Sequence, residues 1–268
     1  MLKPAIAYFK SLVTICLLVY FSFVTFVSPA QAGKFMASLP FDTSTNVIEV
    51  AAIYETSYTT QKAIVKSLKV SNKPMKKALG FKGFSLLQSQ DGKQVIALSQ
   101  WNDLDSYQAY IPASATVTTS KSKSPDGAVT IPEPSQTQIF EIVSAKTSIS
   151  GAIPALRGKE AVVRFTQLTP KSPEMRSQVL TNLEEMISST MQNQPIPQSV
   201  IVLKSLDSDD VAIMTNWNCS AMFEDVGKPE AIALSSSLNE LVDNKQSIYN
   251  VMTIIPYEVK KDKESKKD

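Results

Sequence analysis

The sequence predicts an α+β fold built from two tandem copies of one β-α-β-β-α-β unit. Residues 47–146 and residues 160–256 show the same order of strand-like and helix-like segments. The two tryptophans of the chain, Trp101 and Trp217, each end a strand-like segment and each precede an asparagine. A repeat of this length indicates two copies of one supersecondary unit rather than one large mixed domain.

The elements of the first unit follow from local sequence patterns. The clearest is a hairpin, because Asp91-Gly92 stands between two strand-like runs. The helix before it carries Ile64 and Leu68 on one side and a row of lysines on the other. The expected strands are 47–54, 81–88, 94–101 and 138–145, the helices are 59–79 and 103–110, and a polar insertion rich in Ser, Thr and Pro occupies 112–136.

The second unit repeats this order. Its first helix is expected to begin at Ser172, an N-cap residue followed by Pro173 at the first helical position. The expected strands are 161–168, 199–205, 210–217 and 246–255, with helical sequence from 173 and again over 220–242, broken near 227–229. An extension at 33–46 precedes the units, a linker at 147–159 joins them, and a charged tail at 257–268 follows.

Both faces of each predicted sheet are apolar. In the first strand, Ala51 and Ile53 point to one side, while Val50 and Tyr54 point to the other. Helices can cover one face only, so the second face must pack against another surface. We therefore expect the two units to pack sheet to sheet in one intrachain α/β barrel. The mature protein is then expected to be a monomer.

The chain begins with a segment typical of export. Lys3 and Lys10 are followed by an uncharged apolar stretch over 12–27 and by an A-x-A triplet at 30–32, the order found in signal peptides. We expect residues 1–32 to be removed and the mature protein to be periplasmic or secreted, without a membrane partner. An uncleaved anchor is the alternative, because the apolar stretch approaches the roughly 18 residues that span a bilayer.

The charge of the mature chain disfavours nucleic acid as a partner. The full chain has 27 basic and 25 acidic residues, and the expected signal peptide contains two lysines and no acid. Subtracting those two lysines leaves 25 basic and 25 acidic residues. Nucleic-acid binding depends on an excess of Lys and Arg, which this chain lacks.

The chain contains no histidine. Catalysis by Ser-His-Asp or Cys-His groups is therefore excluded, as are zinc and haem sites that depend on histidine. Cys16 lies in the expected signal peptide, which leaves Cys219 without an internal disulfide partner. One thiolate without further ligands is weak evidence for a metal site. We expect Cys219 to be a buried structural residue. We expect the protein to use no metal ion and no cofactor.

Two motifs of the first unit carry a family resemblance. They are L-G-F-K-G-F at residues 79–84 and S-Q-W at 99–101. A glycine- and phenylalanine-rich turn leading into a hairpin that ends on Ser-x-Trp resembles the antibiotic biosynthesis monooxygenase (ABM) family. The resemblance covers about residues 47–256. It implies ferredoxin-like units whose sheets close into one α/β barrel, normally between two chains.

The same resemblance implies the candidate site. Cofactor-free oxygenases of the family hold a phenolic substrate with a strand-end Trp, a nearby Asn and a following Tyr, so the candidate catalytic residues are Trp101, Tyr107 and Asn102. The Asn that the family places four residues before the Trp is Ala97 here. The candidate ligand-binding residues are Trp217, Asn218 and Tyr54. The haem-degrading branch is excluded, because its iron ligand is a histidine.

Two functions remain open at this stage. One is a cofactor-free monooxygenase acting on a small phenolic or apolar molecule. The other is a non-catalytic protein that binds a small apolar or aromatic ligand, or a partner, in the barrel cavity. Each tryptophan also has a purely structural interpretation as a large side chain that seals a strand against a helix. The carboxylate pairs Glu184-Glu185 and Asp209-Asp210 are expected to be solvated.

Overall fold

The computed structural model describes residues 37–117, 133–191, 197–217 and 234–256. These residues belong to one compact unit. The expected signal peptide, most of the insertion, Asn218, Cys219 and the charged tail lie outside the described residues.

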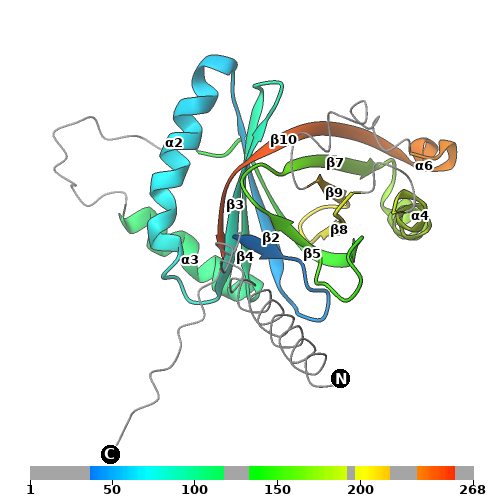
Figure 1. The fold of residues 1–268 in the computed structure, drawn as a ribbon, viewed down its shortest axis with the longest axis horizontal. Coiled ribbons are helices and arrows are strands. Elements are labelled where there is room, and N and C mark those ends of the chain that lie inside the picture. The colour runs from blue at the N-terminus through cyan, green and yellow to red at the C-terminus, as the bar shows by residue number, and fades with distance from the viewer. Residues whose placement is uncertain (1–36, 118–132, 192–196, 218–233, 257–268) are drawn as a thin grey trace, which may run out of the picture. The chain divides into compact units, whose positions relative to one another are not determined.

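The described strands form a closed eight-stranded barrel (Figure 1), in the order β10-β3-β4-β2-β5-β8-β9-β7, and every neighbouring pair is antiparallel. The predicted α+β fold class, with two ferredoxin-like units in one intrachain barrel, is confirmed. The strands are β2 (Ile48–Glu55), β3 (Phe81–Ser89), β4 (Gln94–Trp101), β5 (Gln136–Thr147), β7 (Val162–Pro170), β8 (Ser199–Ser205), β9 (Val211–Trp217) and β10 (Val242–Pro256).

Two long strands close the barrel. The first half has the strand order β3-β4-β2-β5, and the second half has the order β8-β9-β7-β10. β5 pairs with β2 over residues 136–141 and with β8 over residues 140–147. β10 pairs with β7 over 242–250 and with β3 over 249–256. The last strand of each half thus pairs with strands of both halves. None of these eight strands is therefore left as an edge strand.

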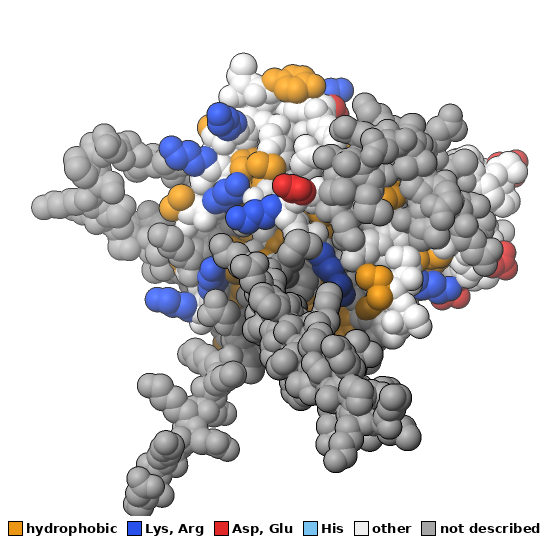
Figure 2. Space-filling model, in the orientation of Figure 1, with side chains coloured by type: hydrophobic (Ala, Val, Ile, Leu, Met, Phe, Trp, Pro, Cys, Tyr) orange, Lys and Arg blue, Asp and Glu red, His pale blue; other side chains and the backbone are white. Residues whose placement is uncertain are grey.

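The described helices cover the outside of the barrel (Figure 1). The first half carries α2 (Tyr58–Met75) and α3 (Leu104–Val117), and the second half carries a 3₁₀ turn, η1 (Pro173–Met175), α4 (Arg176–Thr190) and α6 (Ser236–Leu241). The lysine face predicted for α2 is exposed, and Figure 2 shows basic side chains over this side of the molecule. Among the described residues, no helix has the length and hydropathy needed to cross a membrane.

Strand alternation divides the apolar side chains between the barrel interior and its outer faces. Ala51 and Ile53 face the interior, whereas Val50 and Tyr54 face the helices, as predicted. The interior cluster consists of Leu39, Phe41, Ala51, Ile53, Leu87, Ile96, Leu98, Phe140, Leu156, Ala161, Val163, Phe165, Ile201, Leu203, Ala212, Met214, Tyr249, Val251 and Ile254. The interior is therefore a packed core.

A small second sheet packs on one end of this core. It consists of β1 (Ser38–Pro40) and β6 (Ala155–Arg157), which pair antiparallel and lie in the extension and the linker that the sequence analysis treated as irregular. Leu39 and Leu156 are fully buried in the interior cluster. The extension and linker thus cover the end of the barrel where β3 begins and β4 ends.

Candidate functional site

Trp101 lies on the helix-covered outer face of the first half. In β4, Ile96 and Leu98 point into the barrel, while Val95 and Trp101 pack in the outer cluster. The Trp101 side chain is fully buried. Its indole Nε1 donates a hydrogen bond to Ser99 Oγ at 3.0 Å. The indole is therefore anchored to its own strand, which gives Trp101 a structural role.

Aromatic rings surround Trp101. The ring centroids of Phe81 and Tyr107 both lie 5.7 Å from that of Trp101, and that of Tyr110 lies 5.0 Å away. These separations are typical of favourable aromatic pairs. Tyr107 and Tyr110 stand three residues apart on α3 and so share one helix face. Tyr107 was predicted to be a site residue and Tyr110 was not, although the three-residue spacing on a helix could have indicated it.

Tyr54 completes what we call the tyrosine cluster, Tyr54, Tyr107 and Tyr110. Burial, together with the smaller effect of the neighbouring hydroxyls of Tyr107 and Tyr110, raises the pKa of Tyr54 to about 12. Burial also raises the pKa of Tyr107 and of Tyr110. The three phenols are therefore neutral at physiological pH and can donate hydrogen bonds.

Asn102, the third candidate catalytic residue, does not join this cluster. Its side chain is exposed, and its Nδ2 donates to Asp103 Oδ2 at 2.9 Å. Its backbone N–H donates to the Gly80 carbonyl at 2.7 Å. Asp103 in turn accepts a hydrogen bond from the Ser106 backbone N–H in the first turn of α3. The structure brings Trp101 and Tyr107 together and places Asn102 in the turn before the helix.

The glycines of the L-G-F-K-G-F motif allow two close approaches. Gly80 has a φ of 79°, and a Cβ there would lie 2.3 Å from Ser106 Oγ on α3. A Cβ on Gly83 would lie 2.4 Å from Leu39 Cδ1 of β1. Gly80 therefore lets α3 bring its tyrosines close to the sheet, and Gly83 lets β1 reach the barrel core.

Trp217 occupies the corresponding position in the second half. β7 and β9 place Val162 opposite Trp217, as β2 and β4 place Ile48 opposite Trp101. Val162 and Ile248 pack against the Trp217 ring. The candidate ligand-binding residues are thus divided, since Tyr54 belongs to the Trp101 face and Trp217 to the other half.

Inward side chains fill much of the barrel interior among the described residues. A cavity of about 20 Å³, which is room for about one water molecule, lies at the end of the barrel away from β1 and β6. A ligand in the barrel stays a prediction. The cavity is lined by Ile53, Gln94, Ile96, Gln136, Phe165, Gln167, Lys245, Ser247 and Tyr249.

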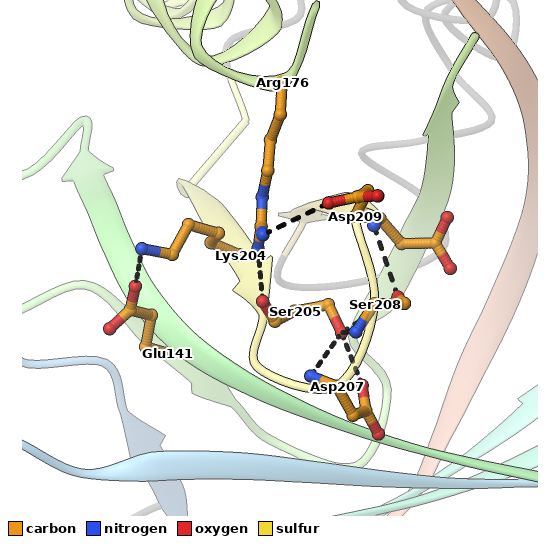
Figure 3. Close-up of polar contacts among 8 residues, drawn as sticks. Glu141, Arg176, Lys204, Ser205, Asp207, Ser208 and Asp209 are labelled. Atoms are coloured by element: carbon orange, nitrogen blue, oxygen red, sulfur yellow. Dashed lines mark hydrogen bonds and ion pairs between the residues drawn. The ribbon is translucent and has the colours of Figure 1, made fainter. Parts of the chain in front are cut away.

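Polar contacts with Arg176 and within the turn hold the acidic turn between β8 and β9 (Figure 3). The Asp209 carboxylate pairs with Arg176 Nη1 at 3.8 Å, and Arg176 also donates to the Ser205 carbonyl. Asp210, expected to be solvated, is half-buried and accepts hydrogen bonds from Thr169 Oγ1 at 2.7 Å and Gln138 Nε2 at 3.0 Å. These contacts give the turn a structural role. Glu184 and Glu185 are exposed, as expected.

Comparison with known proteins finds solved structures with a similar fold. No family model and no curated protein sequence matches the chain. An anthrone oxidase-like protein of known structure matches with a TM-score of 0.57 and 14% identity over 83% of this chain and 98% of its own. A proposed monooxygenase from Fusobacterium nucleatum subsp. nucleatum matches with a TM-score of 0.53 and 11% identity over 79% of this chain and 95% of its own. The chain therefore shares the α/β-barrel fold of these two proteins.

A third structure is more distant. It is a ferredoxin-fold protein from Listeria monocytogenes related to antibiotic biosynthesis monooxygenases, with a TM-score of 0.38 and 12% identity over 78% of this chain and 98% of its own. At these identities the likeness concerns the fold alone. In the described ranges, no group of three or more His, Cys, Asp or Glu side chains is arranged to hold a metal ion.

Proposed function

We propose that the mature chain is an exported protein that binds a small phenolic or apolar aromatic molecule beside Trp101 and oxidises it with O₂ without a cofactor. The observation that carries the proposal is the convergence of three neutral tyrosine hydroxyls next to a buried tryptophan on one helix-covered face. The likeness of the fold to an anthrone oxidase-like protein supports it.

The tyrosine cluster suits a substrate that reacts through its oxyanion. Neutral phenol hydroxyls can donate hydrogen bonds to a phenolate or enolate oxygen and so stabilise it in a largely buried site. Such an electron-rich anion can reduce O₂ directly. For anthrone, the ring methylene loses two hydrogens and gains one oxygen atom, while the second oxygen atom leaves as water. The substrate supplies all the electrons, which is why no cofactor is required.

Binding without turnover is the second candidate function. Trp101 has no exposed surface, and its indole N–H is already bonded to Ser99. The three tyrosines around it have raised pKa values, which makes them poor general bases at neutral pH. These observations favour a protein that holds an aromatic ligand and leaves it unchanged.

Replacing Tyr107 with Phe tests the proposed site. The substitution keeps the ring against Trp101 and removes one hydroxyl. We expect anthrone to bind roughly two- to tenfold more weakly, the loss of about one hydrogen bond, with an unchanged melting temperature. The matched control is Tyr58→Phe, because Tyr58 is 75% exposed. Calorimetry measures binding, and an oxygen electrode measures turnover.

The outcomes separate the two functions. Binding accompanied by one O₂ consumed per anthrone supports the oxygenase, while binding without O₂ consumption supports the second candidate. If Tyr107→Phe binds and oxidises anthrone as the unchanged protein does, the tyrosine cluster is not the site.

Export is proposed from the sequence of residues 1–32. We expect the mature protein to begin at Gly33, because the A-x-A triplet ends at residue 32. The intact mass of the protein recovered from the periplasm or the medium checks this. A mass that includes the first 32 residues would instead indicate a retained anchor.

A further inference from the structure

The charge of the mature chain is unevenly distributed. Residues 56–90, which contain α2, the turn after it and β3, have seven lysines and no acidic residue. Subtracting these seven lysines from the 25 basic residues of the expected mature chain leaves 18 basic residues against 25 acidic ones. A chain without net charge is thus divided into a strongly basic segment and an acidic remainder.

Helix α2 carries its lysines on one exposed side. Lys62, Lys66 and Lys69 follow one another at intervals of four and three residues, which places them along one side of a helix. All three side chains are exposed, whereas Val65 and Leu68 are buried in the outer cluster against the sheet. The lysine side of α2 therefore points away from the barrel.

The turn after α2 continues this basic surface. Lys76 and Lys77 lie in the turn, and both are exposed. We call Lys62, Lys66, Lys69, Lys76 and Lys77 the α2 lysine patch. None of the five takes part in an ion pair within the ranges that the structure describes. Figure 2 shows basic side chains grouped over the side of the molecule where α2 lies in Figure 1. The charges of the patch are therefore available to an external anionic partner.

Exposed apolar side chains lie within the patch. Tyr58 and Val70 extend the line of Lys62 and Lys66 at intervals of four residues, and they are 75% and 62% exposed. Leu79, in the turn, is 91% exposed. Such side chains can enter the headgroup region of a membrane while the lysines contact lipid phosphates. A soluble polyanion would use the lysines alone, so the apolar side chains favour a membrane surface.

We propose that the α2 lysine patch binds the surface of a membrane that contains anionic phospholipid. Each lysine close to such a surface strengthens binding about fivefold, so five lysines give a reversible association without an anchor. The acidic remainder of the chain is repelled by the same surface, which favours contact through α2. The proposal departs from the sequence-based expectation of no membrane partner. It is independent of the proposed oxidation, because neither Trp101 nor the tyrosine cluster belongs to the patch.

Flotation with lipid vesicles tests the patch. The protein used begins at Gly33, so that residues 1–32 cannot insert into the bilayer. The vesicles are pure phosphatidylcholine or an equal mixture of phosphatidylcholine and phosphatidylglycerol. We expect the protein to float with the anionic vesicles and not with the neutral ones. Rising salt concentration should release it, because salt screens exposed charges.

A triple variant tests which side of the protein meets the lipid. Replacing Lys62, Lys66 and Lys69 together with Gln removes three exposed charges from α2. The binding constant for anionic vesicles should fall at least tenfold. The melting temperature should stay the same, because all three side chains are exposed.

The matched control makes the same change of charge outside the patch. Lys146, Lys159 and Lys245 are exposed and do not belong to the basic segment. Replacing these three lysines together with Gln should weaken binding to anionic vesicles much less than the triple variant in α2 does.

Val70→Ser combined with Leu79→Ser separates a membrane from a soluble polyanion. We expect this double variant to bind anionic vesicles several-fold more weakly and to bind heparin, a soluble polyanion, as the unchanged protein does. The proposal is overturned if the unchanged protein does not float with anionic vesicles, or if the two triple variants lose binding equally. It is also overturned if the double variant floats as the unchanged protein does, since the lysines alone then account for binding.

Discussion

At the scale of single residues, Glu49 is the least expected feature of the core. It lies at the β1 end of the barrel and is fully buried. Gln100 Nε2 donates to Glu49 Oε1 and to the Pro40 carbonyl, both at 2.6 Å. The other carboxyl oxygen has no hydrogen-bond partner among the described residues. Burial raises the pKa of Glu49 well above its ordinary value, although the Gln100 bond acts in the opposite direction.

Glu49→Gln should therefore stabilise the protein at high pH. A carboxyl whose folded pKa is raised contributes stability that is complete below its unfolded pKa, about 4.5, and is lost as the pH rises through the folded pKa. The neutral amide escapes this loss. We expect the variant to melt at a higher temperature than the unchanged protein at pH 8, with the difference shrinking towards pH 4.5. Thermal unfolding across this range checks it, and a difference that does not vary with pH would contradict it.

We predict that Trp101 stabilises the fold, independently of any role in ligand binding. Trp101→Ala removes a fully buried ring and should cost about 3–5 kcal/mol of the free energy of unfolding. Ser99→Ala leaves the indole N–H buried without its acceptor and should cost about 1–3 kcal/mol. Urea unfolding measures both. Little change in either variant would show that the ring is not anchored as described.

At the scale of elements, β1 and β6 decide how one end of the barrel is covered. Both pack on the core from segments whose composition suggests loops. A three-residue strand cannot be recognised from periodicity, because its alternation is too short to count. Tertiary contacts hold β1 in place. They are the pairing with β6, the hydrogen bond from Gln100 to the Pro40 carbonyl and the space left by Gly83.

Leu39→Ala tests the contribution of β1. Leu39 is fully buried in the interior cluster, and truncating it should cost about 2–5 kcal/mol of the free energy of unfolding. Leu79→Ala is the matched control, since Leu79 is 91% exposed and should change that free energy by less than about 0.5 kcal/mol. Equal effects of the two substitutions would mean that β1 does not form part of the core.

At the scale of the whole molecule, the chain closes its own barrel. The outer strands of each half, β3 with β5 and β8 with β10, find their partners in the other half. We therefore propose that the mature protein is a monomer. Light scattering should give the mass of one chain at all concentrations. A stable dimer would show that partners are also available between chains, and it would leave the fold unchanged.

The sequence by itself determined the fold class and the order of the elements. Local patterns can be recognised in a sequence without knowledge of the fold. Examples here are the strand alternation around Ala51 and Ile53, the Asp91-Gly92 turn and the repeated Trp-Asn pair. The resemblance to the ABM family also implied one candidate site that contains Trp101 and Tyr107.

Only the tertiary structure decided on which face that site lies and what else belongs to it. Trp101 proved to face the helices, Asn102 to face solvent, and Tyr110 to complete the cluster. Thr215, which β9 places directly opposite Arg164, lies 51 positions further along the chain. The extra lengths of β5 and β10 depend on pairing with the opposite half. Contacts of this kind are set by the closure of the barrel, which no local pattern encodes.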